Sequence, residues 1–215
     1  MPKKLDPEQE RLRLEQMRIY ERQYGDLTPV CGIDAAGRGP LAGPVFAAAV
    51  ILPPDFPGEG IRDSKKLSEK KREALEAIIK EKALAFSVCA VEVPLIEEVN
   101  ILNATFIAMK SALAKLTVCP EFVLVDGNRS PGIELSHDCI VGGDDKSLSV
   151  AAASILAKVA RDRFVKGVLA KEYPQYQFEK HKGYGTKLHF EKIAEFGPCP
   201  QHRRSFLKKK FGEFK

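Results

Sequence analysis

CGIDAAGRGPLAG, at residues 31–43, is followed after Pro44 by the apolar run VFAAAVIL at 45–52. Two β-rich runs joined by a glycine-rich turn predict the first two strands of a sheet. A dinucleotide-binding turn is not indicated, because the glycines are spaced GxGxxxG and the turn leads into an extended run instead of a helix. The turn is therefore either a tight hairpin-like connection with an exposed Arg38, or a surface where backbone amides approach a bulky ligand.

Strands and helices alternate along the rest of the chain. Short runs rich in Val, Ile, Phe and Ala predict five strands, at 30–34, 45–52, 84–93, 121–127 and 137–145. Apolar residues at helical spacing predict helices at 7–24, 69–82, 94–116, 147–173 and 189–196, with a loop at 182–187. Hairpin strands followed by alternating helices and strands predict an α/β fold, with a mixed sheet flanked by helices.

Charge and composition divide the chain into three parts. We predict an N-terminal helical extension at 1–28, a main domain at 29–200 and a basic tail at 201–215. The sequence has 34 Lys and Arg against 29 Asp and Glu, a net charge of +5, and the tail alone has six basic residues and one acidic residue. Such a tail is either a solvated end or a contact for nucleic acid, because Lys and Arg release counterions when they neutralise phosphates.

Cysteine usage and hydropathy indicate the compartment. The five cysteines are odd in number and contain no CxxC pair, so neither a disulfide framework nor a zinc site is indicated. The charged N-terminal region lacks the apolar core of a signal peptide, and no apolar run approaches the length of a membrane span. We therefore expect a cytoplasmic protein without membrane contact, and nothing in the sequence indicates an obligate oligomer, so we expect a monomer.

Three acidic residues come at the ends of predicted strands or just after one. These are Asp34, Asp126 and Asp144. In open sheets, ligands collect outside the carboxyl ends of the strands, and clustered carboxylates require a cation, for which oxygen ligands favour Mg²⁺ or Mn²⁺. Two such ions about 4 Å apart would support phosphodiester hydrolysis. Each Asp alone could instead cap a turn or helix. We give Asp138 and Asp145 a structural role, because Asp138 sits in the middle of a predicted strand and Asp145 suits the first turn of a helix.

Several motifs, in order, resemble those of ribonuclease HII. They span roughly residues 30–207 and read IDxAGRGPLAGPV at 33–45, DSKKLS at 63–68, VDG at 125–127, GDxKS at 143–147, AAASILAKVARD at 151–162, HKGYGTKxH at 181–189 and HRRSF at 202–206. The resemblance implies a ribonuclease H-like fold with a mixed five-stranded sheet and a helical C-terminal segment. It implies an endonuclease that cuts the RNA strand of RNA/DNA hybrids and incises 5′ of single ribonucleotides in duplex DNA, leaving 5′-phosphate and 3′-hydroxyl ends.

The resemblance also implies roles for particular residues. The same three aspartates would bind Mn²⁺ or Mg²⁺ in a two-ion mechanism. Gly37, Arg38 and Gly39 would contact the 2′-hydroxyl side of the ribonucleotide, and Tyr184 would stack on the next deoxyribose. The phosphate contacts would be Lys65, Lys66 and Lys182, although exposed lysines are usually only solvated. A sliding clamp is a further partner to consider, because QHRRSFLKKKF has spaced aromatic residues, but this match is weak.

Ala35 departs from the family motif, which reads DEAGRG and has a glutamate at this position. A missing metal ligand implies near-absent cleavage with substrate binding retained, so Ala35 marks a catalytically impaired variant. We favour an engineered substitution because the other motifs are intact, although the sequence leaves a natural origin open. The alternative is a naturally non-catalytic protein that binds RNA/DNA junctions. A different nuclease of this fold, such as an integrase or resolvase relative, is disfavoured by the GRG and HKGYG motifs.

Overall fold

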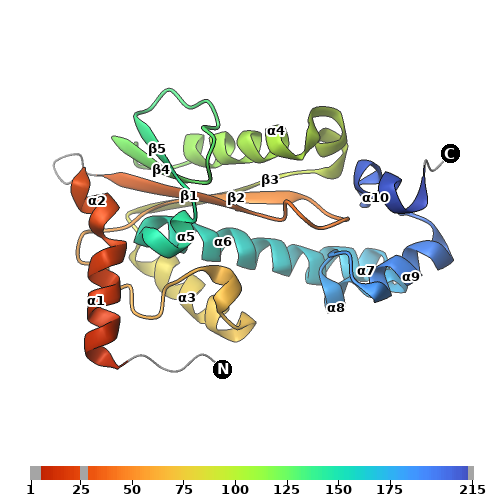
Figure 1. The fold of residues 1–215 in the computed structure, drawn as a ribbon, viewed down its shortest axis with the longest axis horizontal. Coiled ribbons are helices and arrows are strands. Elements are labelled where there is room, and N and C mark those ends of the chain that lie inside the picture. Colours follow the sequence, from red (N-terminus) through yellow and green to blue (C-terminus); the bar gives the residue numbers. More distant parts are fainter. Residues whose placement is uncertain (1–5, 25–28, 213–215) are drawn as a thin grey trace.

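The computed structural model describes residues 6–24 and 29–212. Its centre is a sheet of five strands in the order β3-β2-β1-β4-β5 (Figure 1). The strands are β1 (Val30–Ala36), β2 (Val45–Ile51), β3 (Ala85–Val91), β4 (Phe122–Asp126) and β5 (His137–Ile140). Because β1 pairs antiparallel with β2 and parallel with β4, the sheet is mixed, which confirms the predicted fold class.

Helices cover both faces of this sheet (Figure 1). α4 (Val93–Ala114) packs on one face, and α6 (Leu148–Phe164) with α3 (Glu69–Lys82) packs on the other. The start of α6 comes very close to β1, since a Cβ atom added to Gly32 would lie 2.2 Å from the carbonyl carbon of Ser149. Only glycine permits this approach, which fixes the start of α6 against β1.

The long helices differ from their predicted form. α4 is interrupted at Asn100, which has a φ of 67° and whose side-chain oxygen accepts hydrogen bonds from the amides of Leu102 and Asn103. Asn100 thus caps a second helix inside the predicted one. The helix predicted at 147–173 is α6 followed by a π-helical turn at Val165–Leu169 and α7 (Ala170–Glu172). The acidic end of the strand predicted at 137–145 is instead a helical turn, α5 (Gly143–Lys146).

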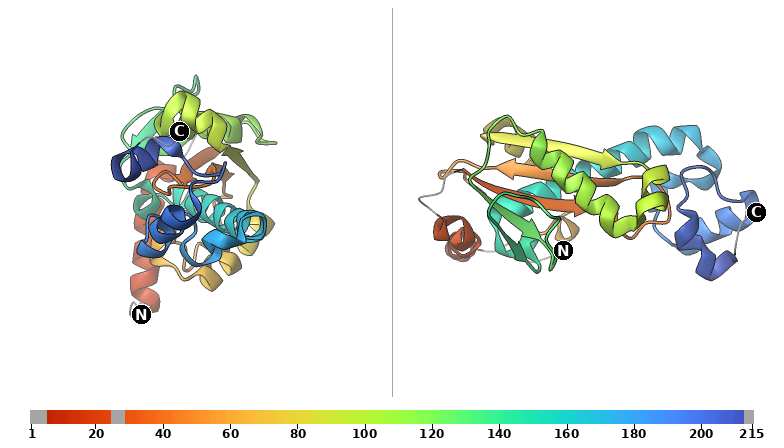
Figure 2. Two further views of the ribbon diagram at one scale, coloured as in Figure 1. Left: turned by 90° about the vertical axis from the view of Figure 1, so that its right-hand side faces the viewer. Right: turned by 90° about the horizontal axis from the view of Figure 1, so that it is seen from above.

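The C-terminal segment forms a small helical unit at one end of the sheet (Figure 2). It contains α8 (Phe178–His181), α9 (Lys187–Phe196) and α10 (Arg204–Phe211). The basic segment that begins at 201 is predicted from its charge as a tail, but its described residues pack against the domain. Both His202 and Arg203 are buried, because their polar atoms find partners inside the domain.

The N-terminal segment, residues 6–24, also packs against the domain. It contains α1 (Pro7–Met17) and α2 (Ile19–Gln23), so the single helix predicted at 7–24 divides at Arg18. Asp6 and Gln9 form a reciprocal capping box at its start. Met17 is buried in the core beneath α6. Across the described residues, none of the helices combines the length and apolarity that spanning a membrane requires.

Candidate active site

The three acids picked out from strand ends lie at the same end of the sheet. Asp34 is on β1, and Asp126 ends the parallel neighbour β4, one position beyond the last β1–β4 residue pair. Asp144 is in α5, and the amide of the preceding Gly143 donates a 2.8 Å hydrogen bond to Asp126 Oδ1. Parallel register and this single bond therefore bring residues from three distant segments together.

Burial, and the closeness of the three carboxylates to one another, raise the pKa values of Asp34 and Asp144. Asp34 is only 7% exposed, and burial, followed by the charge of Asp126, raises the pKa of Asp34 to about 8. The Ala35 amide, which donates to Asp34 Oδ1 at 2.6 Å, opposes this rise. Burial also raises the pKa of Asp144, against the charge of Lys65. Because the buried carboxylates disfavour one another's charge, a bound cation would stabilise the cluster.

Lys65 supplies positive charge to this cluster. Its ammonium lies 3.2 Å from Asp144 Oδ2 and 3.8 Å from Asp63 Oδ1. In the part of the chain that the structure describes, no three Asp, Glu, His or Cys side chains are arranged as a complete metal site. The aspartates fit a hard divalent cation by donor type, but in this arrangement Asp144 pairs with Lys65. Because a carboxylate offers two oxygens and Lys65 contacts only Oδ2, Asp144 can ligate an ion with or without this pair.

Ala35 lies between Asp34 and the end of β1. It packs with the apolar cluster under α4, whereas Asp34 is directed to the α6 side, where Ser154 is its partner. Side chains alternate along a strand, so the two neighbours start from opposite faces of the sheet. Ala35 is only half-buried and β1 ends one residue later, so a longer side chain there has access to solvent.

The loop 37–43, which carries the GRG motif and is called the GRG loop below, is held by the buried side chain of Arg203. This guanidinium is fully buried, and its hydrogen bonds of 2.7 to 3.2 Å run to the carbonyl oxygens of Gly37, Arg38, Pro40 and Gly43. All of these acceptors are backbone groups, so the charge of Arg203 is held by carbonyl dipoles. The loop is therefore fixed from inside, while Arg38 and Gly39 are exposed at its tip.

A second buried arginine joins the GRG loop to the loop that carries Tyr184. Arg161 on α6 donates from Nη2 to the carbonyl oxygens of Ala42, at 3.2 Å, and Lys182, at 3.1 Å. Its Cζ lies 5.6 Å from the Tyr184 ring centroid, and Lys158 Nζ lies 5.4 Å from the same ring. The two cations hold the aromatic face, so Tyr184 is 41% exposed yet has a defined position beside the GRG loop.

The other predicted phosphate contacts have acidic partners. Lys66 Nζ lies 2.5 Å from Asp145 Oδ2, and Lys182 Nζ lies 3.6 Å from Glu69 Oε2. Asp145 thus has the structural role that its position in the first turn of a helix predicted. A phosphate that contacts these lysines competes with their carboxylate partners. The exposed Lys66–Asp145 pair is worth only about 1 kcal/mol or less, whereas the Lys182–Glu69 pair is partly buried.

Three buried histidines form a chain behind the Tyr184 loop. The rings of His181 and His189 are stacked with centroids 4.1 Å apart, and His189 Nε2 lies 3.0 Å from His202 Nε2. His189 Nδ1 donates to the Tyr184 carbonyl oxygen, and His202 Nδ1 accepts from the Cys199 amide. His202 therefore carries its proton on Nε2 and donates it to His189, so the network requires neutral rings.

This network predicts that the protein loses stability in mild acid. Burial, then the neighbouring His181, lowers the pKa of His189 to about 3, and burial lowers the pKa of His202 to about 4. Unfolded histidine titrates near 6.5, so below that pH the unfolded chain binds more protons and the free energy of unfolding falls. We expect a loss of roughly 4 kcal/mol between pH 7 and pH 5 from these two residues.

Urea unfolding at pH 5, 6, 7 and 8 measures this effect. His137→Gln is the control, because His137 lies outside the cluster and its variant should keep the same slope. A free energy of unfolding that stays constant between pH 7 and pH 5 would contradict the neutral network.

The sequence patterns predict no role for Arg161, Arg203 or the histidine chain. All of them fall within motifs quoted above, at 151–162, 181–189 and 202–206. The one feature of the sequence that could have indicated a role was the presence of these charged and imidazole side chains inside family motifs. The burial of the arginines could not be predicted from the sequence, because their hydrogen-bond partners are carbonyl groups up to 166 positions away.

Comparisons with known proteins agree with this arrangement. The family model described as Ribonuclease HII matches residues 31–211. A ribonuclease HII from Caldicellulosiruptor saccharolyticus is 57% identical over 180 residues, which cover 83% of this chain and 87% of that protein.

Solved structures resemble the fold as a whole. The ribonuclease H2 from Pyrococcus horikoshii OT3 has a TM-score of 0.70 and 26% identity, covering 85% of this chain and 96% of its own. A PCNA:RNase HII complex from Archaeoglobus fulgidus gives a TM-score of 0.67 and 26% identity, covering 86% of this chain and 97% of that one. Motifs, sheet topology and the extent of these matches agree that this chain belongs to the ribonuclease HII family.

Proposed function

We propose that this chain is built to cut the RNA strand of RNA/DNA hybrids and to incise 5′ of single ribonucleotides in duplex DNA, leaving 5′-phosphate and 3′-hydroxyl ends. The observation that carries the proposal is the GRG loop, which begins at the end of β1, three positions after Asp34. Arg203 fixes this loop from inside, and Arg161 joins it to the Tyr184 loop. A surface that reads a nucleotide thus lies next to a cluster of acids. Family membership supports the reaction class.

Asp34, Asp126 and Asp144 are the residues that would hold Mg²⁺ or Mn²⁺. When bound, two such ions activate a water molecule and stabilise the leaving oxygen of the phosphodiester. Lys65 would balance part of the negative charge of Asp144, and its exposed ammonium would also be within reach of a phosphate oxygen.

The GRG loop would distinguish ribonucleotide from deoxyribonucleotide. Gly39 has no atom within 4 Å of where a Cβ would be, so the loop backbone is open to a sugar at this point. The 2′-hydroxyl both donates and accepts hydrogen bonds, which backbone groups of Gly37, Arg38 and Gly39 can satisfy. Tyr184 would stack on the following deoxyribose, while Lys66 and Lys182 would contact phosphates.

Ala35 limits what this chain can do with a bound substrate. Where the family motif has a glutamate, this chain offers no carboxylate, so we propose that cleavage is nearly absent and that binding is retained. The same observation favours the second candidate, a non-catalytic protein that binds RNA/DNA junctions with the same surface.

Binding to a panel of duplexes tests the recognition part of the proposal. We expect a duplex with one ribonucleotide to bind at least tenfold more tightly than the same duplex in DNA, because a missing hydrogen-bond partner costs about 1 to 3 kcal/mol. Tyr184→Ala should weaken this binding about tenfold, since it removes the apolar surface of a large aromatic ring from contact with the sugar.

Phe196→Ala is the matched control, because Phe196 is also an exposed aromatic residue of the C-terminal unit, 49% exposed, but lies on α9. Fluorescence anisotropy gives the dissociation constants without requiring turnover. Preference for branched DNA over both duplexes would overturn the proposed function in favour of another nuclease of this fold.

A sliding clamp and a monomeric state complete the proposal. The archaeal relative in complex with PCNA supports a clamp as partner. In this chain, however, Leu207 is buried and the Phe206 ring centroid lies 5.3 Å from Arg203 Cζ, so the apolar residues of α10 already pack within the domain. A clamp contact through α10 would have to use its lysine face.

A further inference from the structure

The N-terminal segment, residues 6–24, lies outside the part of the chain that the family model matches, and the proposed function gives it no role. Figure 1 shows α1 and α2 beside the end of the sheet, next to α5 and the start of α6. The segment therefore contacts the region from which Asp144 comes.

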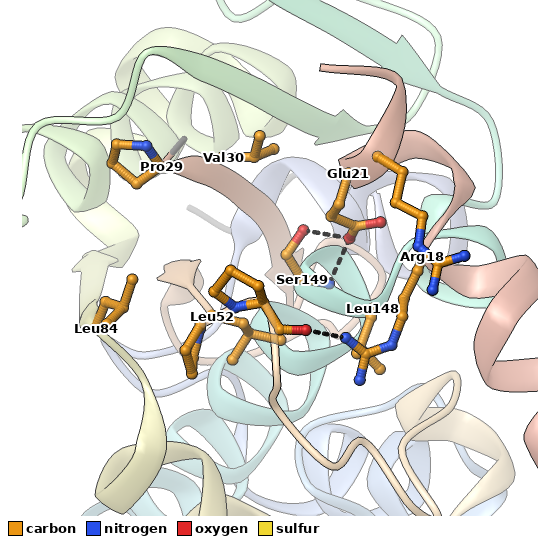
Figure 3. A pocket seen from close by; sticks show the side chains of 11 residues that line it. Arg18, Glu21, Pro29, Val30, Leu52, Leu84, Leu148 and Ser149 are labelled. Atoms are coloured by element: carbon orange, nitrogen blue, oxygen red, sulfur yellow. Dashed lines mark hydrogen bonds between the residues drawn. The ribbon is translucent and has the colours of Figure 1, made fainter. Parts of the chain in front are cut away.

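Glu21 on α2 makes the closest of these contacts (Figure 3). A single carboxylate oxygen, Oε1, accepts hydrogen bonds from Ser147 Oγ at 2.6 Å, the Ser149 amide at 2.9 Å and Ser149 Oγ at 2.8 Å. Both serines are buried, and they begin the 17-residue helix α6. A negative charge at this point also suits the positive end of the helix dipole.

The serines that Glu21 holds are linked directly to the acid cluster. The Ser147 amide donates to the Gly143 carbonyl oxygen at 2.8 Å, which closes the turn that contains Asp144. The Gly143 amide in turn donates to Asp126. On the other side, Ser149 packs against Gly32 of β1, two residues before Asp34. Through its hydrogen bonds to the two serines, Glu21 therefore holds residues 143–149 next to β1, the strand that carries Asp34.

The same N-terminal segment holds the loop that leads to Lys65. Glu10 Oε1 accepts from the Gly60 amide at 2.9 Å, and Arg13 Nη1 donates to the Ile61 carbonyl oxygen at 2.7 Å. Arg18 Nη1 donates to the Pro54 carbonyl oxygen at 2.7 Å, a bond that is drawn in Figure 3. Both chain segments that meet in the Lys65–Asp144 pair are thus tied to residues 6–24.

We propose that the N-terminal segment is an internal brace of the acidic site, and that Glu21 is a positioning residue that sets Asp144 against Asp34 and Asp126. Glu21 touches neither substrate nor the acids, so it acts through Ser147 and Ser149. The proposal concerns the geometry of the folded chain, and only its effect on turnover rests on the proposed function.

Amide hydrogen exchange in the full chain tests the brace. In Glu21→Gln, which keeps an acceptor oxygen but loses the charge, we expect the amides of Ser149 and Gly143 to exchange at least about tenfold faster, since hydrogen bonds to charged groups are the stronger ones. Glu8→Gln is the control, because Glu8 is exposed on α1 and pairs only with Arg11 in the described structure. Its exchange at both amides should match the parent chain.

Gly143 is the decisive amide, because it contacts Asp126 and not Glu21. Faster exchange at Ser149 alone would show that Glu21 only caps α6, and would overturn the proposal. Ser149→Ala serves if Glu21→Gln does not fold, since it removes one of the three donors, and it should accelerate exchange at Gly143 in the same direction.

A kinetic readout separates positioning from folding. In a chain that also carries Ala35→Glu, we expect Glu21→Gln to lower kcat about tenfold while KM stays within about twofold. This is the lower end of the roughly 10- to 100-fold that loss of a direct partner of a metal ligand costs, because Glu21 acts through Ser147 and Ser149. An unchanged kcat would overturn the proposal that Glu21 positions Asp144. If the Ala35→Glu chain does not cleave at all, the proposed function fails, while hydrogen exchange still decides the proposal for Glu21.

Discussion

Ala35→Glu is expected to raise the rate of cleavage of a duplex containing one ribonucleotide by roughly a hundred- to a thousandfold in Mg²⁺ or Mn²⁺. Loss of one electrostatic contact to a transition state costs about 3 to 4 kcal/mol, and each 1.4 kcal/mol is about tenfold in rate. The other three acids are already at one end of the sheet, and burial with the charge of Asp126 raises the pKa of Asp34 to about 8. A restored carboxylate would complete the set that holds the ions.

The position of Ala35 makes this a demanding test. Its side chain starts on the α4 face of β1, opposite to Asp34, so a glutamate there must turn round the end of the strand to reach the acids. Glutamate has the length for this, and Ala35 is half-buried at a strand end. A purely apolar role for the position would instead predict a destabilised chain without turnover.

Ala90→Glu is the matched control, because it makes the same substitution on the exposed face of the edge strand β3 and gives the same net charge. Initial rates on the single-ribonucleotide duplex are the measurement, with thermal unfolding recorded for each variant. A gain below about tenfold from a folded Ala35→Glu chain would sink the idea of an interrupted metal site. With binding to junctions retained, that result would favour the non-catalytic candidate.

The strands and the acids could be predicted from the sequence because their determinants are local. A β-rich run that ends in an aspartate, as at 122–126, identifies both the element and the position of its carboxylate. Parallel pairing of β1 with β4 then brings Asp34 and Asp126 to the same end. Apolar residues at helical spacing predicted the helix at 69–82 for the same reason, and α3 covers Glu69–Lys82 with Ser68 as its cap.

The support of the site could not be predicted in this way, since its determinants are long-range. Charge at 201–215 indicated either a solvated end or a contact for nucleic acid, and both interpretations place the basic side chains on the surface. Arg203 is buried nonetheless, since the turns of the GRG loop direct several carbonyl oxygens to one point. Glu21 is similar: nothing in its own helix shows that its partners are serines more than 120 positions away.

Arg203→Ala is expected to destabilise the protein by about 3 kcal/mol or more, because a buried acceptor left without its donor costs about 1 to 3 kcal/mol and several carbonyl oxygens lose their donor together. Truncation leaves the carbonyl oxygens of Gly37, Pro40 and Gly43 without their donor in a buried setting. The loss is large although burial, then the neighbouring Arg161, lowers the pKa of Arg203 to about 9. Urea unfolding at pH 7 measures it, and Arg204→Ala, an exposed neighbour on α10, should differ from the parent by less than about 0.5 kcal/mol.

Arg203→Lys separates the stability of the loop from its function. Lysine keeps a charge but lacks the planar fork that reaches several carbonyl oxygens at once, so we expect a folded chain with a loosened GRG loop. Its affinity for the single-ribonucleotide duplex should fall about tenfold, while its affinity for the all-DNA duplex changes little, because phosphate contacts carry no information about the 2′-hydroxyl. Equal losses for both duplexes would mean that Arg203 supports only the fold. A selective loss would place discrimination between RNA and DNA in a loop whose shape is set by a buried arginine 160 residues away from Gly43.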